Sequence, residues 1–209
     1  MVKVIGICGF QGAGKDTLAN IFVEKYGYKK LSFASIVKDV CASIFSWDRE
    51  MLEGATKESR IEREKVDYWW AKKLNISMFT PRYALQFIGT ELFRNGFHKD
   101  IWLLAIERQI FKYDKVVISD CRFPNEINML RSLENSTIIH ITRNLPSWFE
   151  LYYNTGNFEF IPANLHTSEW EWIVPGCIDC TIENNYDTID GLINYIELNS
   201  RDILYRVII

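Results

Sequence analysis

The segment Val2–Tyr26, VKVIGICGFQGAGKDTLANIFVEKY, decides the fold of this chain. Its first part, Val2–Cys8, is short, apolar and rich in β-branched residues, which predicts a buried β-strand. A glycine-rich stretch, Gly9–Lys15, follows without interruption. Asp16–Tyr26 then carries apolar residues at helical spacing, namely Leu18, Ile21 and Phe22. Strand, glycine-rich turn and helix form the context that a phosphate-binding loop requires.

The spacing of Gly9, Gly14 and Lys15 matches G-x-x-x-x-G-K. Glycines let the backbone curl so that successive N–H groups point at phosphate oxygens, and the following helix adds the positive end of its dipole. Lys15 supplies a point charge for the β- and γ-phosphates. We therefore expect ATP to bind at Gly12, Ala13, Gly14, Lys15, Asp16 and Thr17.

The position after Lys15 usually carries Ser or Thr, whose hydroxyl binds Mg²⁺. Here it is Asp16, and Thr17 follows. Asp16 can hold Mg²⁺ directly or through water, or it can cap the helix. The sequence leaves these alternatives open.

Composition favours one globular domain spanning residues 1–209. The chain is 48% hydrophobic and 24% charged, enough for a substantial core. Its net charge of -3 gives no basic field for a nucleic acid polymer. Apolar runs are too short to span a bilayer, and the start does not resemble a signal peptide, so no membrane partner is expected.

The chain has five cysteines, an odd number, which predicts reduced thiols and a cytoplasmic location. Cys177 and Cys180 form one C-x-x-C pair, but no histidine has the spacing of a zinc site. The pair leads into a strand-like segment, whereas a redox pair normally opens a helix. We interpret both as small apolar residues at the start of a strand.

Apolar strands alternate with helical patterns along the chain, which predicts an α/β fold with a parallel sheet covered by helices on both faces. The expected strands after the first are Lys30–Ala34, Lys115–Asp120, Thr137–Thr142 and Cys180–Glu183. The expected helices include Ile36–Phe45, a helix capped by Thr80 that runs to Phe93, Asp100–Tyr113, a helix ending at Leu133 and Asp187–Leu198.

Two segments do not fit this alternation. Trp47–Lys65 is charged and irregular, with a helix expected only at Glu58–Arg63. Asn144–Thr167 is rich in aromatic residues, Pro and Asn and shows no period. A loop of this length in a compact domain is usually a lid or a binding loop.

Ligands of parallel α/β sheets bind at the carboxyl ends of the strands. This rule places the Gly9–Lys15 loop, Asp120, Arg122 and Arg143 along one rim. Asp120 can act on Mg²⁺ through water, accept a proton from the nucleophile, cap a helix or pair with Arg122.

Phosphoryl transfer requires two phosphates in line and their charge neutralised. Arg143 can close over the donor phosphates. Arg82, Arg94 and Arg122 are candidates for the acceptor phosphate through bidentate contacts. For each arginine, a solvated ion pair is the alternative.

These residues carry a resemblance to the deoxynucleoside monophosphate kinases of bacteriophages and large DNA viruses, a branch of the P-loop nucleoside monophosphate kinases. The shared stretches occur in one order over nearly the whole chain, and most are weakly specific alone. They are Gly12–Thr17, Ser32–Asp39, Arg82–Glu91 followed by Arg94 and Trp102, Ser119–Glu126, His166–Glu169 and Ile182–Asn184.

The resemblance implies ATP-dependent phosphorylation of deoxynucleoside monophosphates with Mg²⁺. It also implies a three-layer P-loop fold with an acceptor-binding insertion, here residues 47–80, and a lid, residues 143–169. It leaves a homodimer possible.

Residue roles carry over by position in these motifs. The resemblance implies that Lys15 and Thr17 hold donor phosphates. It also implies that Asn184 lies near the ATP base, with a turn residue as the alternative, and that Arg82, Gln86 and Arg122 hold the acceptor, with Lys38 on the same substrate side. Phe33, Phe87, Trp69 and Trp70 can wall the acceptor base, although core or lid packing is the favoured interpretation of the two tryptophans.

Three other functions are weighed. A different P-loop kinase, such as a dephospho-coenzyme A kinase or a sugar kinase, is disfavoured by Arg82–Glu91. A non-catalytic ATP-binding regulatory protein would not need Asp120, Arg122 and a lid. For hydrolysis of ATP to drive motion, the sequence shows nothing that resembles a segment for coupling to a partner.

Overall fold

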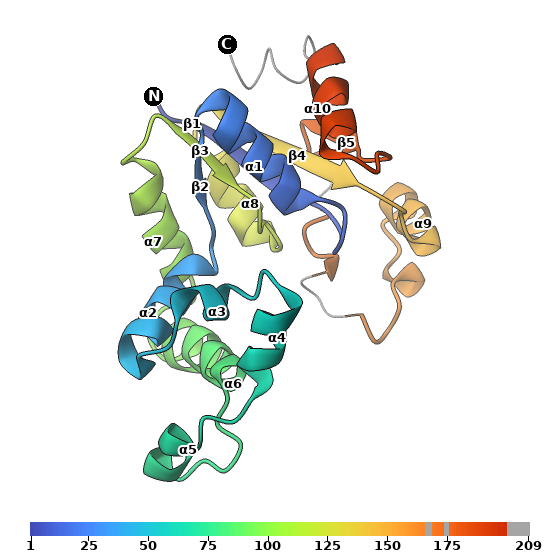
Figure 1. Cartoon of the computed structure of the whole chain (residues 1–209). Coiled ribbons are helices and arrows are strands. Elements are labelled where there is room, and N and C mark those ends of the chain that lie inside the picture. The colour runs from blue at the N-terminus through green and yellow to red at the C-terminus, as the bar shows by residue number, and fades with distance from the viewer. Residues whose placement is uncertain (166–168, 174–175, 200–209) are drawn as a thin grey trace. The chain divides into compact units, whose positions relative to one another are not determined.

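The computed structural model describes residues 1–165, 169–173 and 176–199 (Figure 1). The chain divides into two compact units. The first contains Met1–Leu31 and the described residues from Glu107 onward, and the second contains Ser32–Ile106. The second unit includes the whole of the predicted insertion at 47–80.

The first unit is built on a five-stranded sheet in the order β2-β3-β1-β4-β5. Every adjacent pair of these strands is parallel, as the sequence predicts. The strands are β1 (Lys3–Cys8), β2 (Lys29–Leu31), β3 (Lys115–Ile118), β4 (Ser136–Thr142) and β5 (Cys180–Glu183). From the central strand β1 the chain first forms β2 and β3 on one side and then β4 and β5 on the other, so the carboxyl end of β1 lies at the topological switch point.

Helices cover both faces of this sheet, which confirms the three-layer α/β architecture. On one face, α1 (Lys15–Tyr26) and α10 (Ile189–Leu198) share a core cluster with strand residues (Figure 1). Members of that cluster include Ile5, Ile7, Leu18, Phe22, Ile139, Leu192 and Ile196. On the other face, α8 (Pro124–Arg131) buries Ile127 and Leu130, and Leu130 lies against Gly6 of β1. Each fully buried side chain of this size contributes about 1.5–3 kcal/mol.

One predicted strand is misplaced. The strand expected at Lys30–Ala34 begins one residue earlier and ends at Leu31. Beyond it the chain turns, because Ser35 donates both its backbone N–H and its hydroxyl to the carbonyl oxygen of Ser32, at 3.1 and 2.7 Å. This turn leads directly into α2 (Ser35–Phe45).

The described part of the second unit is helical. Its elements are α2, α3 (Arg49–Glu53), α4 (Lys57–Glu64), α5 (Tyr68–Leu74), α6 (Pro81–Gln86) and a π-helix, η1 (Phe87–Asn95). Its own core includes Cys41, Phe45, Leu52, Phe79 and Ile88. The helix α7 (Ile101–Ile110) follows and crosses the boundary into the first unit.

The predicted start of α6 is confirmed. Thr80 Oγ1 accepts a hydrogen bond from the Tyr83 N–H at 3.1 Å, and Pro81 occupies the first helical position. The predicted single helix to Phe93 is wrong in one respect, since from Phe87 its backbone becomes a π-helix.

The prediction for Trp47–Lys65 missed a helix. Besides α4, the segment contains α3, whose N-cap Asp48 accepts hydrogen bonds from the N–H groups of Glu50 and Met51 at 2.6 and 2.9 Å. A helix of five residues is too short to show a hydrophobic period, so the cap was its only available signal.

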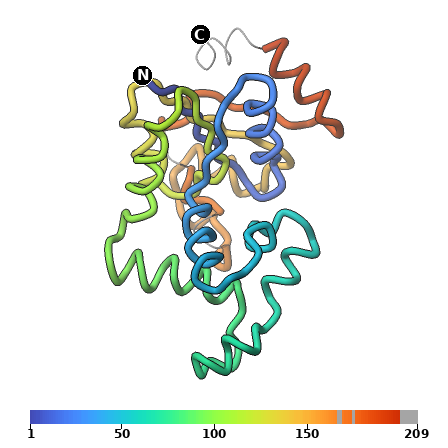
Figure 2. Tube along the Cα trace, turned by 60° about the vertical axis from the view of Figure 1, so that its left-hand side comes forward, coloured from blue at the N-terminus to red at the C-terminus, as the bar shows by residue number. Residues whose placement is uncertain are grey.

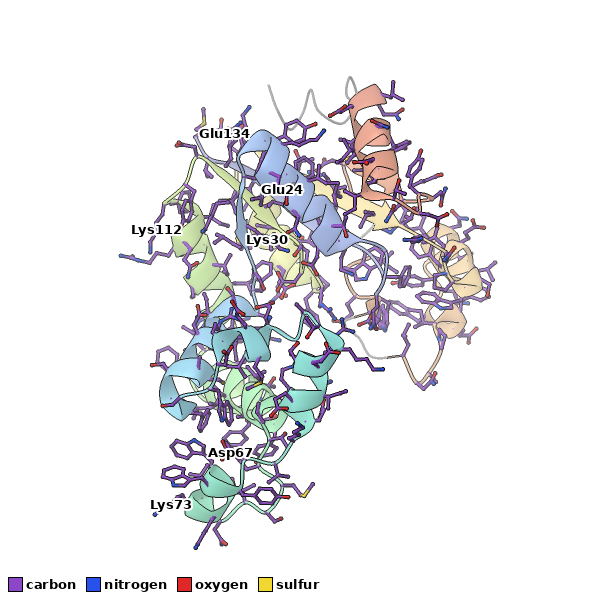
Figure 3. All side chains as sticks on the ribbon, in the orientation of Figure 1. Glu24, Lys30, Asp67, Lys73, Lys112 and Glu134 are labelled. Carbon is purple, nitrogen blue, oxygen red and sulfur yellow. The ribbon has the colours of Figure 1, made fainter. Side chains whose placement is uncertain are left out.

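Trp69 and Trp70 differ in burial. Trp70 is partly buried and donates from Nε1 to the Phe45 carbonyl at 3.2 Å, which confirms a packing role. Trp69 is 60% exposed and packs edge-on against Trp70. Both lie in α5, between the labelled Asp67, its N-cap, and Lys73 (Figure 3).

The aromatic-rich segment from Asn144 was predicted as a loop, and this is wrong for part of it. It contains α9 (Ser147–Thr155) and a short 3₁₀ helix (Phe158–Phe160). Phe149 and Tyr152 are buried at helical spacing, so tertiary contacts hold α9. The predicted motif at His166–Ser168 lies outside the described residues.

Within the described ranges, no helix combines the length and the apolar composition needed to cross a membrane.

Candidate phosphate-binding site

The loop after β1 depends on glycine at two positions where the backbone is both left-handed and crowded. Gly9 has φ 147°, and a Cβ there would lie 2.3 Å from the Ile141 carbonyl oxygen. Gly14 has φ 100°, and a Cβ would lie 2.5 Å from Asn184 Nδ2. The loop is therefore seated tightly against β4 and against the segment that follows β5.

Lys15 folds back over this loop. Its Nζ donates to the carbonyl oxygens of Gly9 and Phe10, both at 2.8 Å. Burial lowers the pKa of Lys15 below its ordinary value, and the charge of Arg122 acts in the same direction, whereas Glu169 and Asp16 oppose the shift. The ammonium group is thus held against the carbonyl oxygens of the loop, and its contact with phosphate stays a prediction.

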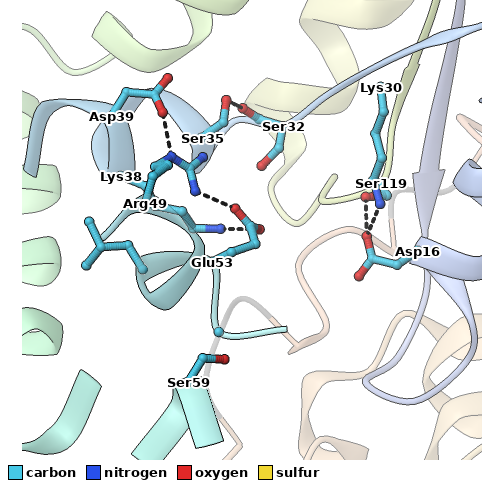
Figure 4. A network of polar contacts seen from close by, with 12 residues as sticks. Asp16, Lys30, Ser32, Ser35, Lys38, Asp39, Arg49, Glu53, Ser59 and Ser119 are labelled. Atoms are coloured by element: carbon cyan, nitrogen blue, oxygen red, sulfur yellow. Dashed lines mark hydrogen bonds and ion pairs between the residues drawn. The ribbon is translucent and has the colours of Figure 1, made fainter. Parts of the chain in front are cut away.

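Asp16 belongs to a three-residue cluster rather than to a helix cap (Figure 4). Its Oδ1 accepts from the Ser119 hydroxyl at 2.8 Å and forms an ion pair with Lys30 Nζ at 2.8 Å. The helix N-cap is Gly14, with no side-chain cap. Burial acts to raise the pKa of Asp16, but the hydrogen bonds from Lys30 and Ser119 outweigh it and hold the pKa below its ordinary value. The capping alternative for Asp16 is therefore wrong.

Lys30 and Ser119 were not predicted as site residues. Lys30 comes from β2 and Ser119 follows β3, and only the pairing of these strands brings both to α1 (Figures 3 and 4).

A magnesium ion fits the site only as part of a nucleotide complex. No group of three or more potential His, Cys, Asp or Glu ligands occurs among the described residues. Mg²⁺ commonly takes one or two carboxylates together with phosphate oxygens and water, and the ionised Asp16 can serve as such a carboxylate. Thr17 lies half-buried in the same helical turn.

The segment after β3 is shaped by a buried carboxylate, the last residue of the Ser119–Glu126 motif, to which the sequence analysis gave no role. Glu126 is 3% exposed, and its Oε2 accepts from the backbone N–H groups of Arg122 and Phe123 at 2.7 and 3.1 Å. This contact fixes the turn that follows the half-buried Asp120. Arg122 extends from the turn and its Nη1 lies 3.2 Å from Glu169 Oε1.

Asn184 and Arg143 differ in how firmly the fold holds them. Asn184 is buried, and its Nδ2 donates to the Ala13 carbonyl of the loop at 2.9 Å. This contact supports the loop, so a contact of Asn184 with the ATP base stays a prediction. Arg143 follows β4 and lies 3.5 Å from Asp187, which is fully solvent-exposed, so this ion pair is weak.

An aromatic cluster joins the loop to α9. The ring of Phe10 packs edge-on against Trp148, Phe149 and Trp172, with centroids 5.6, 5.5 and 5.1 Å apart. His140 of β4 lies beneath them, 4% exposed, and its Nε2 has no hydrogen-bond partner among the residues that the structure describes. Burial, aided by the charge of Lys15, lowers the pKa of His140 to about 4.

The candidate acceptor residues other than Arg122 lie in the second unit. Lys38 Nζ contacts Glu53 Oε1 at 2.6 Å, in a network with Arg49 and Asp39 (Figure 4). Arg82 Nε lies 3.3 Å from Glu64 Oε1, and both side chains are more than half exposed. Phe33 is buried, whereas Arg94 is half-buried.

Gln86 lines a pocket of about 320 Å³ in this unit. The remaining lining residues are Tyr83, Phe87, Thr90 and Glu91. The rings of Tyr83 and Phe87 are nearly parallel, at 10°, with centroids 5.9 Å apart. The pocket thus combines two aromatic faces with one amide.

A parallel sheet in this order, with a G-x-x-x-x-G-K loop between its central strand and a helix, defines a P-loop nucleotide-binding fold. The family model for deoxynucleotide monophosphate kinase matches residues 49–147. A putative deoxynucleotide monophosphate kinase of Acanthamoeba polyphaga mimivirus is 30% identical over 143 residues, covering 62% of this chain and 69% of the relative. The deoxynucleoside-5'-monophosphate kinase of Escherichia phage T5 is 32% identical over 181 residues, covering 63% and 72%. The chain belongs to the deoxynucleotide monophosphate kinase family.

Among solved structures, an unliganded sugar kinase from a Janibacter species aligns with a TM-score of 0.43 at 15% identity. The alignment covers 97% of this chain and 95% of that chain.

Proposed function

We propose that this chain transfers the γ-phosphoryl group of ATP to deoxynucleoside monophosphates, giving the deoxynucleoside diphosphate and ADP. One observation carries the proposal: in a chain of this family, Lys15 is fixed over a glycine-built loop, with Arg122 close enough to depress its pKa. Two cations at a backbone anion site are what charge neutralisation during phosphoryl transfer requires.

The donor side is assigned to the first unit. Backbone amides of Gly12–Thr17 and the Lys15 ammonium hold the phosphates, and Arg143 adds charge from the end of β4. Asp16, and Asp120 through water, would hold Mg²⁺, which would neutralise phosphate charge. The ionised state of Asp16 supports this assignment.

The acceptor side is assigned to Arg82, Arg94, Lys38 and Phe33 of the second unit, together with Arg122. Gln86 is supported by its pocket, whose two aromatic faces suit a planar base and whose amide can hydrogen-bond a base edge. The enzyme needs only to position the two phosphates and offset their charge, because the transfer itself requires little covalent chemistry.

We further propose a cytoplasmic site of action and no nucleic acid or membrane partner, with a homodimer as one possible assembly. The five cysteines are all free, which suits a reducing compartment.

An acceptor panel tests the function. ADP release is measured by a coupled assay at saturating MgATP with dTMP, dGMP, dCMP, dAMP and one ribonucleotide. We expect turnover with at least one deoxynucleotide. Turnover with none of them, but with a coenzyme precursor or a sugar, would refute the proposal, and ATP binding without transfer would favour a regulatory protein.

A further inference from the structure

Glu169 is an acidic side chain directed at the proposed phosphate site. Its Oε1 lies 3.2 Å from Arg122 Nη1, and the side chains of Arg122 and Glu169 are 42% and 25% exposed. The contact is monodentate, so the guanidinium group is engaged at one of its nitrogens by this carboxylate. A phosphate oxygen would compete with this carboxylate for the Arg122 guanidinium group.

The position of Glu169 is fixed by the fold. Trp172 is 1% exposed, and its Nε1 donates to the Glu169 carbonyl at 2.9 Å. The Trp172 ring in turn packs against Phe10 of the phosphate loop and against His140, with centroids 5.1 and 4.8 Å apart. The described segment 169–173 is thereby fastened to the loop itself.

Glu169 acts as a counter-ion to two neighbouring cations, Lys15 and Arg122. Lys15 and Arg122 have like charge, and Arg122 acts to lower the pKa of Lys15, whereas Glu169 acts to raise it. Asp16 is already engaged by Lys30 and Ser119. Glu169 thus supplies negative charge close to both cations, as a phosphate group would.

We propose that Glu169 is a tethered anion that stands in for phosphate: without nucleotide it holds Arg122 near Lys15, and a bound phosphate displaces it. It is a positioning residue, since it acts through Arg122. The inference rests on the proposed function only in taking the loop as a phosphate site. A carboxylate that must be displaced weakens phosphate binding, so its neutralisation strengthens binding.

The test is the affinity of the full chain for inorganic tripolyphosphate and for ADP, measured by calorimetry without acceptor. We expect Glu169→Gln to bind both about three- to tenfold more tightly than the unmodified protein, because a negative charge within contact distance of the site is removed. Glu169→Asp keeps the charge and should stay within about twofold of the unmodified protein.

Glu171→Gln is the matched control, since it removes the same charge two residues further along, where Glu171 acts on Tyr152 instead. It should leave both affinities within about twofold. If Glu169→Gln does not fold, Glu169→Ala carries the same expectation.

Weaker or unchanged binding by the folded Glu169→Gln variant, or equal tightening by Glu171→Gln, would overturn the inference. Neither result would affect the proposed function, which depends on the acceptor panel. If the unmodified protein binds neither tripolyphosphate nor ADP, both the role of Glu169 and the proposed function are wrong.

Discussion

Replacing His140 by Leu should remove most of the acid sensitivity of this protein between pH 7 and pH 5. His140 lies on β4 beneath the aromatic cluster and is 4% exposed, and within the described part of the chain its Nε2 has no hydrogen-bond partner. Burial and the charge of Lys15 lower its pKa from 6.5 to about 4. The folded protein therefore keeps this imidazole neutral at a pH where the unfolded chain protonates it.

The direction follows from linkage. Because the unfolded state binds the proton more readily, stability is unaffected well above pH 6.5 and falls as the pH decreases from 6.5 towards 4. The full shift corresponds to about 3 kcal/mol, and about 2 kcal/mol of it is lost between pH 7 and pH 5. His140→Leu lacks this loss, and removal of the unpaired nitrogen should leave stability at pH 7 equal or higher.

The assay is urea unfolding of both proteins at pH 7, 6 and 5, with the free energy of unfolding compared at each pH. Carboxylates titrate alike in both proteins and cancel in the difference. His98→Gln, at an exposed histidine, controls for loss of an imidazole elsewhere. If the unmodified protein and His140→Leu lose stability equally from pH 7 to pH 5, the account of His140 is wrong.

Three further variants test the site. Lys15→Ala should lower turnover at least about 100-fold through lost transition-state stabilisation, and near-normal phosphorylation would contradict its role. Asn184→Ala removes the buried hydrogen bond to the loop. It should lower the free energy of unfolding by about 1–3 kcal/mol and raise the KM for ATP. A lower stability with an unchanged KM would mean that Asn184 does not support the ATP-binding conformation of the loop. Lys30→Met removes a cation that holds the pKa of Asp16 down, so that pKa should rise. Carboxyl titration by NMR measures it, and an unchanged value would mean that Ser119 and Lys15 set it without Lys30.

The sequence by itself determined the phosphate loop and the fold class. Gly9–Lys15 could be recognised because its geometry depends on contiguous residues: glycines supply the left-handed backbone, and the following helix begins at the lysine. The alternation of apolar strands and helices likewise follows from local periodicity, which is why the parallel sheet was predicted correctly.

The neighbours of the loop were decided by the tertiary structure. Lys30 and Ser119 reach Asp16 because β2 pairs with β3, and strand order leaves no mark in a local pattern. Glu169 and Asn184 lie more than 150 positions from the loop they flank or support. The helix α9 was not predicted, because its sequence shows no regular apolar period. Its Phe149 packs instead against Phe10 and Trp172, which are distant in the sequence. Contacts between distant segments depend on which strands pair and in what register, and only the folded chain fixes both.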